Sequence, residues 1–423
     1  DTGSVLAAET IPGSFACMGT SGQGVTCLMD NGEWQNFTRE TSHLGSNFVS
    51  DIDACANGDQ LIMHGSGVSI FNGLEWREIP SGWGFGSPSA IACSGEDEFW
   101  VAHFEGVSHF YDEQWINFDS ANLAFAEEAT DLVEDVAIDI EGNIWVVTAN
   151  SIARFDGDEW RVYQQGQGIA EKYFFDAIAL DNSGRPWVAN SDGLLAFGDE
   201  DWELFQNRNI YTLQDVAVDL QGNKWLATFS QGIALFDGAA WRILDRYSGD
   251  LQSDQVNKIK VDDVGRIWAA TEWGLHVFDG QAWHVYRMDN SELIDNSINT
   301  LAISGNPPLP EPRVFEPGLL SGSITTAEGP HAGALIEICV EAIGTFFEGD
   351  TPCTGQPFVR STISDEAGAF TFPDLPAGYY VITLETADGW SLLETENGFG
   401  SERVLVSAGS NSDLGEVTLN EDG

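Results

Sequence analysis

The fold is decided by one short signature, FDGDEW at residues 155–160, which returns as FDGAAW at 236–241 and FDGQAW at 278–283. Weaker copies are MDNGEW (29–34), FNGLEW (71–76), FYDEQW (110–115) and FGDEDW (197–202). The seven final tryptophans are separated by 42, 39, 45, 42, 39 and 42 residues; they are Trp34, Trp76, Trp115, Trp160, Trp202, Trp241 and Trp283. A period of 40–45 residues marked by tryptophan and turn residues predicts the blades of a β-propeller.

Five units also carry a tryptophan inside an apolar run: DEFWVAH (97–103), GNIWVVT (142–148), GRPWVAN (184–190), GNKWLAT (222–228) and GRIWAAT (265–271). Alternation of apolar and polar residues between Gly and Asp favours strands over helices. The pattern therefore predicts four strands in each unit. In the clearest copy these cover 215–219, 224–228, 233–236 and 241–244.

The first and last units of the array are incomplete. Residues 17–34 align with 225–241 and lack a first strand, whereas 297–304 looks like that missing strand alone. Joining them predicts a composite blade with one C-terminal and three N-terminal strands, which closes a seven-bladed ring without a free edge. The propeller then covers 14–304, after an N-terminal extension at 1–13.

The repeat resembles the two-component-regulator propeller family. The resemblance covers about 14–304 and rests on the pattern N/S-x-V-x-x-I-x-x-D-x-x-G-x-I-W-x-A-T-x-x-G-I-x-x-F, clearest at 257–278. It implies a propeller of the kind that serves as an extracytoplasmic sensor module of signalling proteins. This sequence contains no kinase, receiver or membrane span beside it.

A second module follows a spacer. Residues 305–317, GNPPLPEPRVFEP, hold five prolines and predict a stiff linker. Residues 318–420 resemble the carboxypeptidase-regulatory-like, prealbumin-type family, which implies an Ig-like accessory β-sandwich rather than a peptidase; 421–423 form a tail. The resemblance is carried by Thr362, Asp365, Gly368, Phe370, Phe372, Leu375, Pro376, Ala377, Gly378 and Tyr380.

The six cysteines have local partners. Cys17 and Cys27 lie symmetrically about Gly22 of one expected hairpin, and Cys339 and Cys353 flank one loop. We expect both pairs to be disulfides, which form in oxidising compartments. Cys55 and Cys93, near the ends of two first strands, are left open between a disulfide and buried thiols.

The chain has 67 acidic and 17 basic residues. Such a charge excludes nucleic acid and anionic membrane as partners, because phosphate binding needs a cationic surface. No apolar run is long enough to span a membrane, so we expect no membrane insertion. No signal peptide remains at Asp1, and we expect a processed, exported protein that is extracellular or at the cell surface.

The predicted strand order gives the propeller two different faces. The D-x-x-G and FDG turns occupy one face, and their Asp and Gly residues are read as turn formers. Calcium there is unsupported, because no D-x-D-x-D-G loop occurs. The other face carries variable connections, where function on repeat scaffolds concentrates. Its candidate ligand-binding aromatics, which alternatively pack the loops onto the ring, are Trp83, Phe85, Phe104, Tyr173, Phe229 and Trp273.

No catalytic set is evident. No G-x-S-x-G motif occurs, and the histidines, among them His64, His103 and His276, lack metal-ligand spacing. We therefore expect no enzyme, cofactor or metal. The preferred hypothesis is a secreted scaffold, a self-assembling cell-surface or filament subunit whose partner is itself or another extracellular protein. The alternatives are a glycan- or peptide-binding propeller of adhesin or sensor type, and a polysaccharide-acting enzyme.

Overall fold

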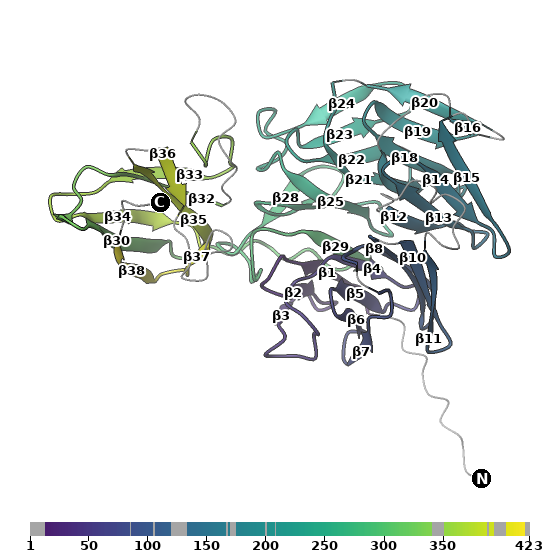
Figure 1. The fold of residues 1–423 in the computed structure, drawn as a ribbon, viewed down its shortest axis with the longest axis horizontal. Helices are drawn as coiled ribbons and strands as arrows, with labels where there is room; N and C mark the ends of the chain where they lie inside the picture. The colour runs from purple at the N-terminus through teal and green to yellow at the C-terminus, as the bar shows by residue number, and fades with distance from the viewer. Residues whose placement is uncertain are drawn as a thin grey trace, which may run out of the picture.

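The computed structural model describes residues 13–84, 86–104, 106–119, 133–165, 168–169, 175–198, 201–207, 209–340, 351–386, 389–392 and 403–418. Within these ranges all regular structure is β, and Figure 1 shows a large ring of sheets beside a smaller module. The expected terminal contacts of residues 1–12 and 421–423 lie outside the described residues.

Six blades are continuous in sequence, and their strands are hydrogen-bonded in chain order. They comprise β4 (Asp51–Ala54), β5 (Gln60–His64), β6 (Gly67–Phe71) and β7 (Trp76–Pro80); β8 (Pro88–Gly95), β9 (Glu98–His103), β10 (Gly106–Tyr111) and β11 (Gln114–Asp119); β12 (Val133–Ile138), β13 (Ile144–Thr148), β14 (Ile152–Phe155), β15 (Trp160–Gln165) and the added short β16 (Gly168–Ile169); β17 (Phe175–Leu180), β18 (Pro186–Asn190), β19 (Gly193–Phe197) and β20 (Trp202–Gln206); β21 (Leu213–Val218), β22 (Lys224–Thr228), β23 (Ile233–Phe236) and β24 (Trp241–Leu244); and β25 (Val256–Val261), β26 (Ile267–Thr271), β27 (Gly274–Phe278) and β28 (Trp283–Tyr286).

The composite blade is confirmed. Strand β29 (Thr300–Ser304) pairs antiparallel with β1 (Phe15–Gly19), which continues to β2 (Val25–Leu28) and β3 (Trp34–Phe37). The first strands of all seven blades contact one another in a closed circle. The chain is therefore a seven-bladed β-propeller closed by one C-terminal and three N-terminal strands.

The two tryptophan positions have different structural roles. The signature tryptophan lies at the start of the fourth strand of each blade, as Trp241 does at the start of β24. The internal tryptophan is buried in the second strand, where its indole reaches the Asp of the D-x-x-G turn; in β22, Trp225 Nε1 donates to Asp219 at 2.9 Å. Trp145, Trp187 and Trp268 repeat this bond. The Asp thus fixes a buried tryptophan as well as the turn.

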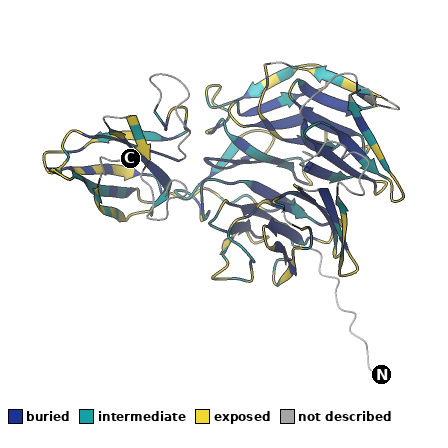
Figure 2. Cartoon of the chain, in the orientation of Figure 1, coloured by how far each residue is buried: buried dark blue, intermediate teal, exposed yellow. Residues whose placement is uncertain are grey.

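Residues 318–418 form two small sheets (Figure 1). The first contains β30 (Gly318–Thr326), β31 (Gly329–Pro330), β34 (Ala369–Leu375) and β38 (Asn411–Thr418). The second contains β32 (Leu335–Cys339), β33 (Val359–Ile363), β35 (Gly378–Thr386), β36 (Gly389–Leu392) and β37 (Arg403–Val406). Side chains of both sheets share one hydrophobic core, and the inner strands of ring and module are the buried parts of the molecule (Figure 2).

Candidate functional site

A polar cavity of about 210 Å³ lies where the first strands of the seven blades converge. Every blade contributes to its lining: Ser50, Asp51, Ser89, Ala90, Glu134, Asp135, Asp176, Gln214, Asn257, Lys258, Asn299 and Thr300. These residues lie at the start of each first strand, so the cavity opens toward the face with the variable connections. Because it combines side chains from the whole ring, it is the candidate functional site.

A recurring β-bulge shapes this cavity. In the first strand of five blades the pairing register skips one residue, for example Glu134 between Val133 and Asp135. The skipped residues line the cavity; they are Ser89, Glu134, Asp176, Gln214 and Asn257. A bulge bends its strand and re-aims a side chain. In β8, β12 and β25 the bulged residue and the residue after it both line the cavity.

Buried aspartates tie neighbouring blades together at the cavity wall. Asp135 accepts a hydrogen bond from the backbone N–H of Ile178 in the next blade at 2.9 Å, and Asp215 does the same for Ile259 at 2.8 Å. Asp51 is likewise bonded to the amide of Ile91 at 3.2 Å. The carboxylates occur in alternate blades, and each satisfies a buried amide of the blade that follows.

One lysine offsets the charge of these aspartates. Lys258 Nζ lies 3.4 Å from Asp51 Oδ1 and 3.8 Å from Asp215 Oδ1. Burial alone lowers the pKa of Lys258, but the nearby carboxylates outweigh burial and hold that pKa above its usual value. Burial raises the pKa of Asp135 to about 6, against the opposing charge of Lys258. This inner cluster stabilises the ring.

Two further carboxyl groups face the cavity without such compensation. Burial, followed by repulsion from Glu134, raises the pKa of Asp176 to about 7. Burial also raises the pKa of Glu134. Asp176 therefore retains its proton close to neutral pH, and beside Glu134 it can both donate and accept hydrogen bonds. In the part of the chain that the structure describes, no three His, Cys, Asp or Glu residues are grouped to hold a metal ion.

Two predicted aromatics flank the cavity. Phe104 is 59% exposed and donates its amide to Ser87 O at 3.3 Å, two residues before the cavity-lining Ser89. Phe229 is 37% exposed and donates its amide to Thr212 O at 2.9 Å, two residues before Gln214. Both residues are therefore exposed aromatics close in the chain pairing to strands that line the cavity.

Trp83 and Trp273 do not have the exposure that a ligand-stacking role needs, because they are only 2% and 4% exposed. Trp83 packs edge-on against the signature Trp115, with ring centroids 5.3 Å apart. Of the two alternatives left open for these tryptophans, ligand contact and packing, their burial favours packing. Phe85 and Tyr173 lie outside the described residues.

His64 belongs to a polar cluster that superficially resembles a catalytic triad. Its Nε2 lies 2.9 Å from Ser69 Oγ, which donates to Glu78 at 2.5 Å. His64 and Ser69 are fully buried between strands of one blade. His103 makes the same 2.8 Å contact with Ser108 in the next blade. These histidines bind strand to strand and are not exposed to a ligand.

Trp273 belongs instead to the joint between the propeller and the C-terminal module. Its indole stacks on Phe358, with ring centroids 5.4 Å apart, and it is part of the module's hydrophobic core. The Arg287 guanidinium lies 5.4 Å from the Trp273 ring centroid. A propeller residue therefore completes the core of the second module.

Polar contacts surround this stacked pair. Arg403 Nη2 of β37 lies 2.6 Å from Oδ2 of the buried Asp295. Burial raises the pKa of Asp295, although Arg403 opposes this effect. Tyr379 Oη donates to Gln23 at 2.9 Å, and Arg246 donates to Gln356 O at 3.0 Å. These bonds come from different blades, so the joint is an extended interface.

All six cysteines are paired. The expected Cys17–Cys27 and Cys339–Cys353 disulfides are present. The pair left open, Cys55–Cys93, is also a disulfide and links the first strands of two neighbouring blades. No described helix has the length and apolar character needed to cross a membrane.

No protein-family model and no curated protein matches this chain. Among solved structures, streptogramin B lyase is similar at a TM-score of 0.51 and 12% identity, with 66% of this chain and 95% of that chain aligned. PorZ, a surface component of the type-IX secretion system of Porphyromonas gingivalis, aligns over 88% of this chain and 62% of its own, at 17% identity and a TM-score of 0.49. The first likeness supports the propeller fold alone.

No sequence motif indicates the inner charge cluster or the joint. Aligning the first strands of the blades places Asp51, Asp135 and Asp215 at one repeat position with Lys258. That alignment would have found the cluster. Asp295 and Arg403 share no motif, and their pairing depends on how the two modules meet.

Proposed function

We propose that this protein is a non-catalytic structural subunit of an extracellular or cell-surface assembly, which polymerises with itself. The observation that carries the proposal is the joint, where Trp273 enters the core of the C-terminal module and Arg403 pairs with Asp295. Domains connected by a linker move relative to each other unless their interface is large and apolar. If the joint holds the two modules in one orientation, every subunit places its two neighbours in the same relative orientation.

The proposed location rests on the three disulfides, which persist in oxidising compartments. We further propose that the propeller is of the two-component-regulator type and that the two small sheets form a prealbumin-type sandwich. With 67 acidic against 17 basic residues, neighbouring subunits repel one another, so assembly requires screening by salt or divalent cations.

The test is sedimentation velocity and negative-stain electron microscopy of the full chain at rising protein, NaCl and CaCl₂ concentrations. We expect polymers with a constant repeat. Arg403→Ala, which removes the ion pair with Asp295 and so loosens the joint, should give irregular or shorter polymers. Arg313→Ala, which removes an exposed pair with Glu292, should not. A chain that stays monomeric under all these conditions would contradict the proposal.

A second candidate function is binding of a glycan or peptide over the central cavity. It is favoured by the cavity of about 210 Å³ and by the exposed rings of Phe104 and Phe229 beside it. Sugar rings stack on aromatic side chains, while Glu134 and Asp176 offer hydrogen bonds to hydroxyl or amide groups.

Glycan and peptide panels with the wild-type chain test this second function. The Phe104→Ala/Phe229→Ala double variant should lose binding, whereas Tyr111→Ala, an exposed aromatic at the turn face of blade three, should retain it. Equal affinity of the double variant and the wild type would reject the cavity as the site. Turnover of any panel glycan would contradict the non-catalytic assignment.

A further inference from the structure

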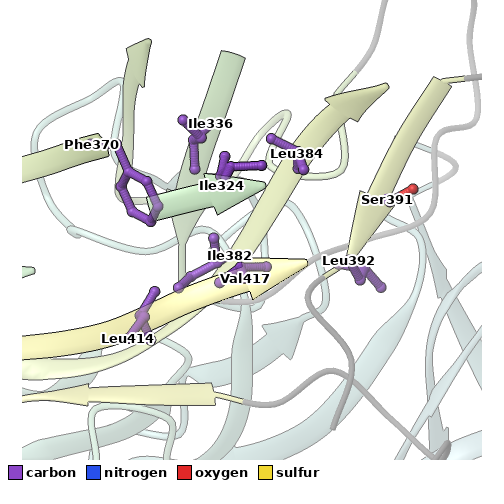
Figure 3. Close-up of a pocket in the computed structure, with 9 residues that line it drawn as sticks. All are labelled: Ile324, Ile336, Phe370, Ile382, Leu384, Ser391, Leu392, Leu414 and Val417. Carbon is purple, nitrogen blue, oxygen red and sulfur yellow. The ribbon is translucent and has the colours of Figure 1, made fainter. Parts of the chain in front are cut away.

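The C-terminal module has an apolar groove between β36 and β38, strands at the margins of its two sheets (Figure 3). Its volume is about 40 Å³, and Ile324, Leu384, Leu392, Leu414 and Val417 contribute to its lining. A water molecule needs only about 10–15 Å³ on the same measure. The groove therefore has room for part of a branched aliphatic side chain.

The two sides of the module differ. On one side β33 leads directly into β34, and these strands of the two sheets contact each other. On the groove side, β36 pairs with β35 and β38 pairs with β30; the described strands include no further partner for either. Unpaired N–H and C=O groups at a strand edge are a template for another strand. In the part of the chain that the structure describes, the groove side thus offers an apolar pocket and two unpaired strand edges, next to the contact between β37 and β38.

We propose that residues 1–12 of a second copy of this chain fill the groove by strand addition, an inference that rests on the assembly function proposed above. The segment reads DTGSVLAAETIP, and residues 2–8 carry no charge. In a strand, Val5 and Ala7 face one way and Leu6 and Ala8 the other. An uncharged stretch approaches an acidic neighbour with less repulsion than a stretch of this chain that carries acidic side chains.

The reach of the segment favours a second copy over its own groove. Ser14 lies beside Gly305, where the linker begins, and the linker uses residues 305–317 to reach the module at Gly318. Phe15 pairs with Ser304 and Gly19 with Thr300, so Ser14 and Asn296 lie near opposite ends of β1, which is about 13 Å long. Gly378 of β35 lies against Asn296 of the propeller, and Leu384, six residues along the strand, is about 20 Å beyond it. From residue 13 back to Val5 an extended chain spans at most about 28 Å.

Binding of a fluorescein-labelled peptide of residues 1–12 to a chain that lacks them, followed by anisotropy, tests the proposal. Leu392→Asp places a charge in the groove and should weaken binding at least about tenfold. Leu405→Asp is the matched control, because Leu405 on β37 is 39% exposed against 38% for Leu392 but does not line the groove. A Leu6→Asp peptide should also bind weakly, and this variant leaves the protein fold untouched.

Sedimentation of the full chain separates this inference from the proposed function. We expect deletion of residues 1–12 and Leu392→Asp to abolish polymers, and Leu405→Asp to retain them. Polymers from the deleted chain would overturn the groove contact while assembly itself stands. If the full chain is monomeric, peptide binding that is sensitive to Leu392→Asp still supports the contact, and no binding overturns it. A third outcome is that the deleted chain binds the peptide but the full chain is monomeric and does not bind it. The segment would then fill the groove of its own chain, and the second-copy assignment would be overturned.

Discussion

The indole of Trp273, in blade seven, stacks on the ring of Phe358, in the C-terminal module, with ring centroids 5.4 Å apart and planes inclined by 22°. Position outside the repeat pattern made Trp273 a ligand-binding candidate. Because Trp273 lies outside the repeat pattern, no blade needs it for packing, and it can join the two modules. A tryptophan that the propeller does not need for its blades is used to hold the adjacent module in place.

Trp273→Ala should uncouple the two modules. Replacement of a buried tryptophan by alanine costs about 3–5 kcal/mol, and here the loss falls on the module core and the joint. Small-angle X-ray scattering should report a larger, more variable distance between the modules. Trp83→Ala is the control, because Trp83 is equally buried but packs within the propeller. Identical scattering of the two variants would show that Trp273 does not fix the joint.

Lys258→Met should destabilise the propeller strongly. The variant leaves Asp51, Asp135 and Asp215 near one another without a cation, and breaking a buried ion pair costs about 3–5 kcal/mol. The deficit should shrink as the pH falls from 7 to 4. Lys258 lowers the pKa of Asp135, so without this lysine the folded variant takes up a proton more readily than the folded wild type does. Denaturant unfolding at several pH values measures this. Adding Asp51→Asn and Asp215→Asn should restore part of the lost stability.

Asp176→Asn should stabilise the chain above pH 7. The pKa of Asp176 is raised to about 7, so this carboxyl stabilises the folded state less and less as the pH rises from about 4 to about 7. Its removal should therefore add on the order of 1–3 kcal/mol at pH 8 and nothing at pH 3.

Asp139→Asn should change the stability of the chain in the opposite direction and serves as the comparison. Burial raises the pKa of Asp139, but hydrogen bonds from Trp145 and Asn143 outweigh burial and lower it. The variant should lose stability above about pH 4, where the wild-type carboxyl is ionised in both states. Matching pH profiles for the two variants would contradict both assignments.

The disulfides should contribute unequally. Cys55–Cys93 closes a loop of 38 residues and Cys17–Cys27 one of 10, and the stabilisation by a cross-link increases with loop length. Replacing Cys55 and Cys93 by serine should cost about 3–4 kcal/mol, and replacing Cys17 and Cys27 by serine about 2–3 kcal/mol. Thermal unfolding with and without reductant checks which pair of serine substitutions costs more stability. Equal losses would indicate that loop length does not govern the effect.

The repeat pattern predicted the ring well because each blade is a local structure. The strands expected at 224–228, 233–236 and 241–244 are β22, β23 and β24 with the same bounds, and β21 differs by at most two residues at either end. Composite closure was also readable, since an absent strand at one end matched an extra strand at the other. The fifth strand of blade four, β16, carries no repeat signature and was not predicted.

The site was predicted less well, because it depends on contacts between blades. Phe104 and Phe229 lie beside the cavity, but the side chains that line it come from seven separate strands. Ring closure was predicted from the sequence, but the recurring bulge, whose extra residue lines the cavity in five blades, carries no common residue type. The burial of Trp83 and Trp273 likewise follows from loop packing and from the second module.

Ring closure through β29 and β1 also dictates an order of events during folding. Cys17 pairs with Ala302, 285 residues later in the chain, so the first blade remains unfinished until almost the whole propeller has been synthesised. The entropy lost in bringing such distant segments together is recovered only at the final step, and contacts of this separation slow folding. A chain truncated before residue 300 would keep the edge of β1 bare. Sealing the ring with its own last strand therefore makes completeness of the chain a condition for a stable fold.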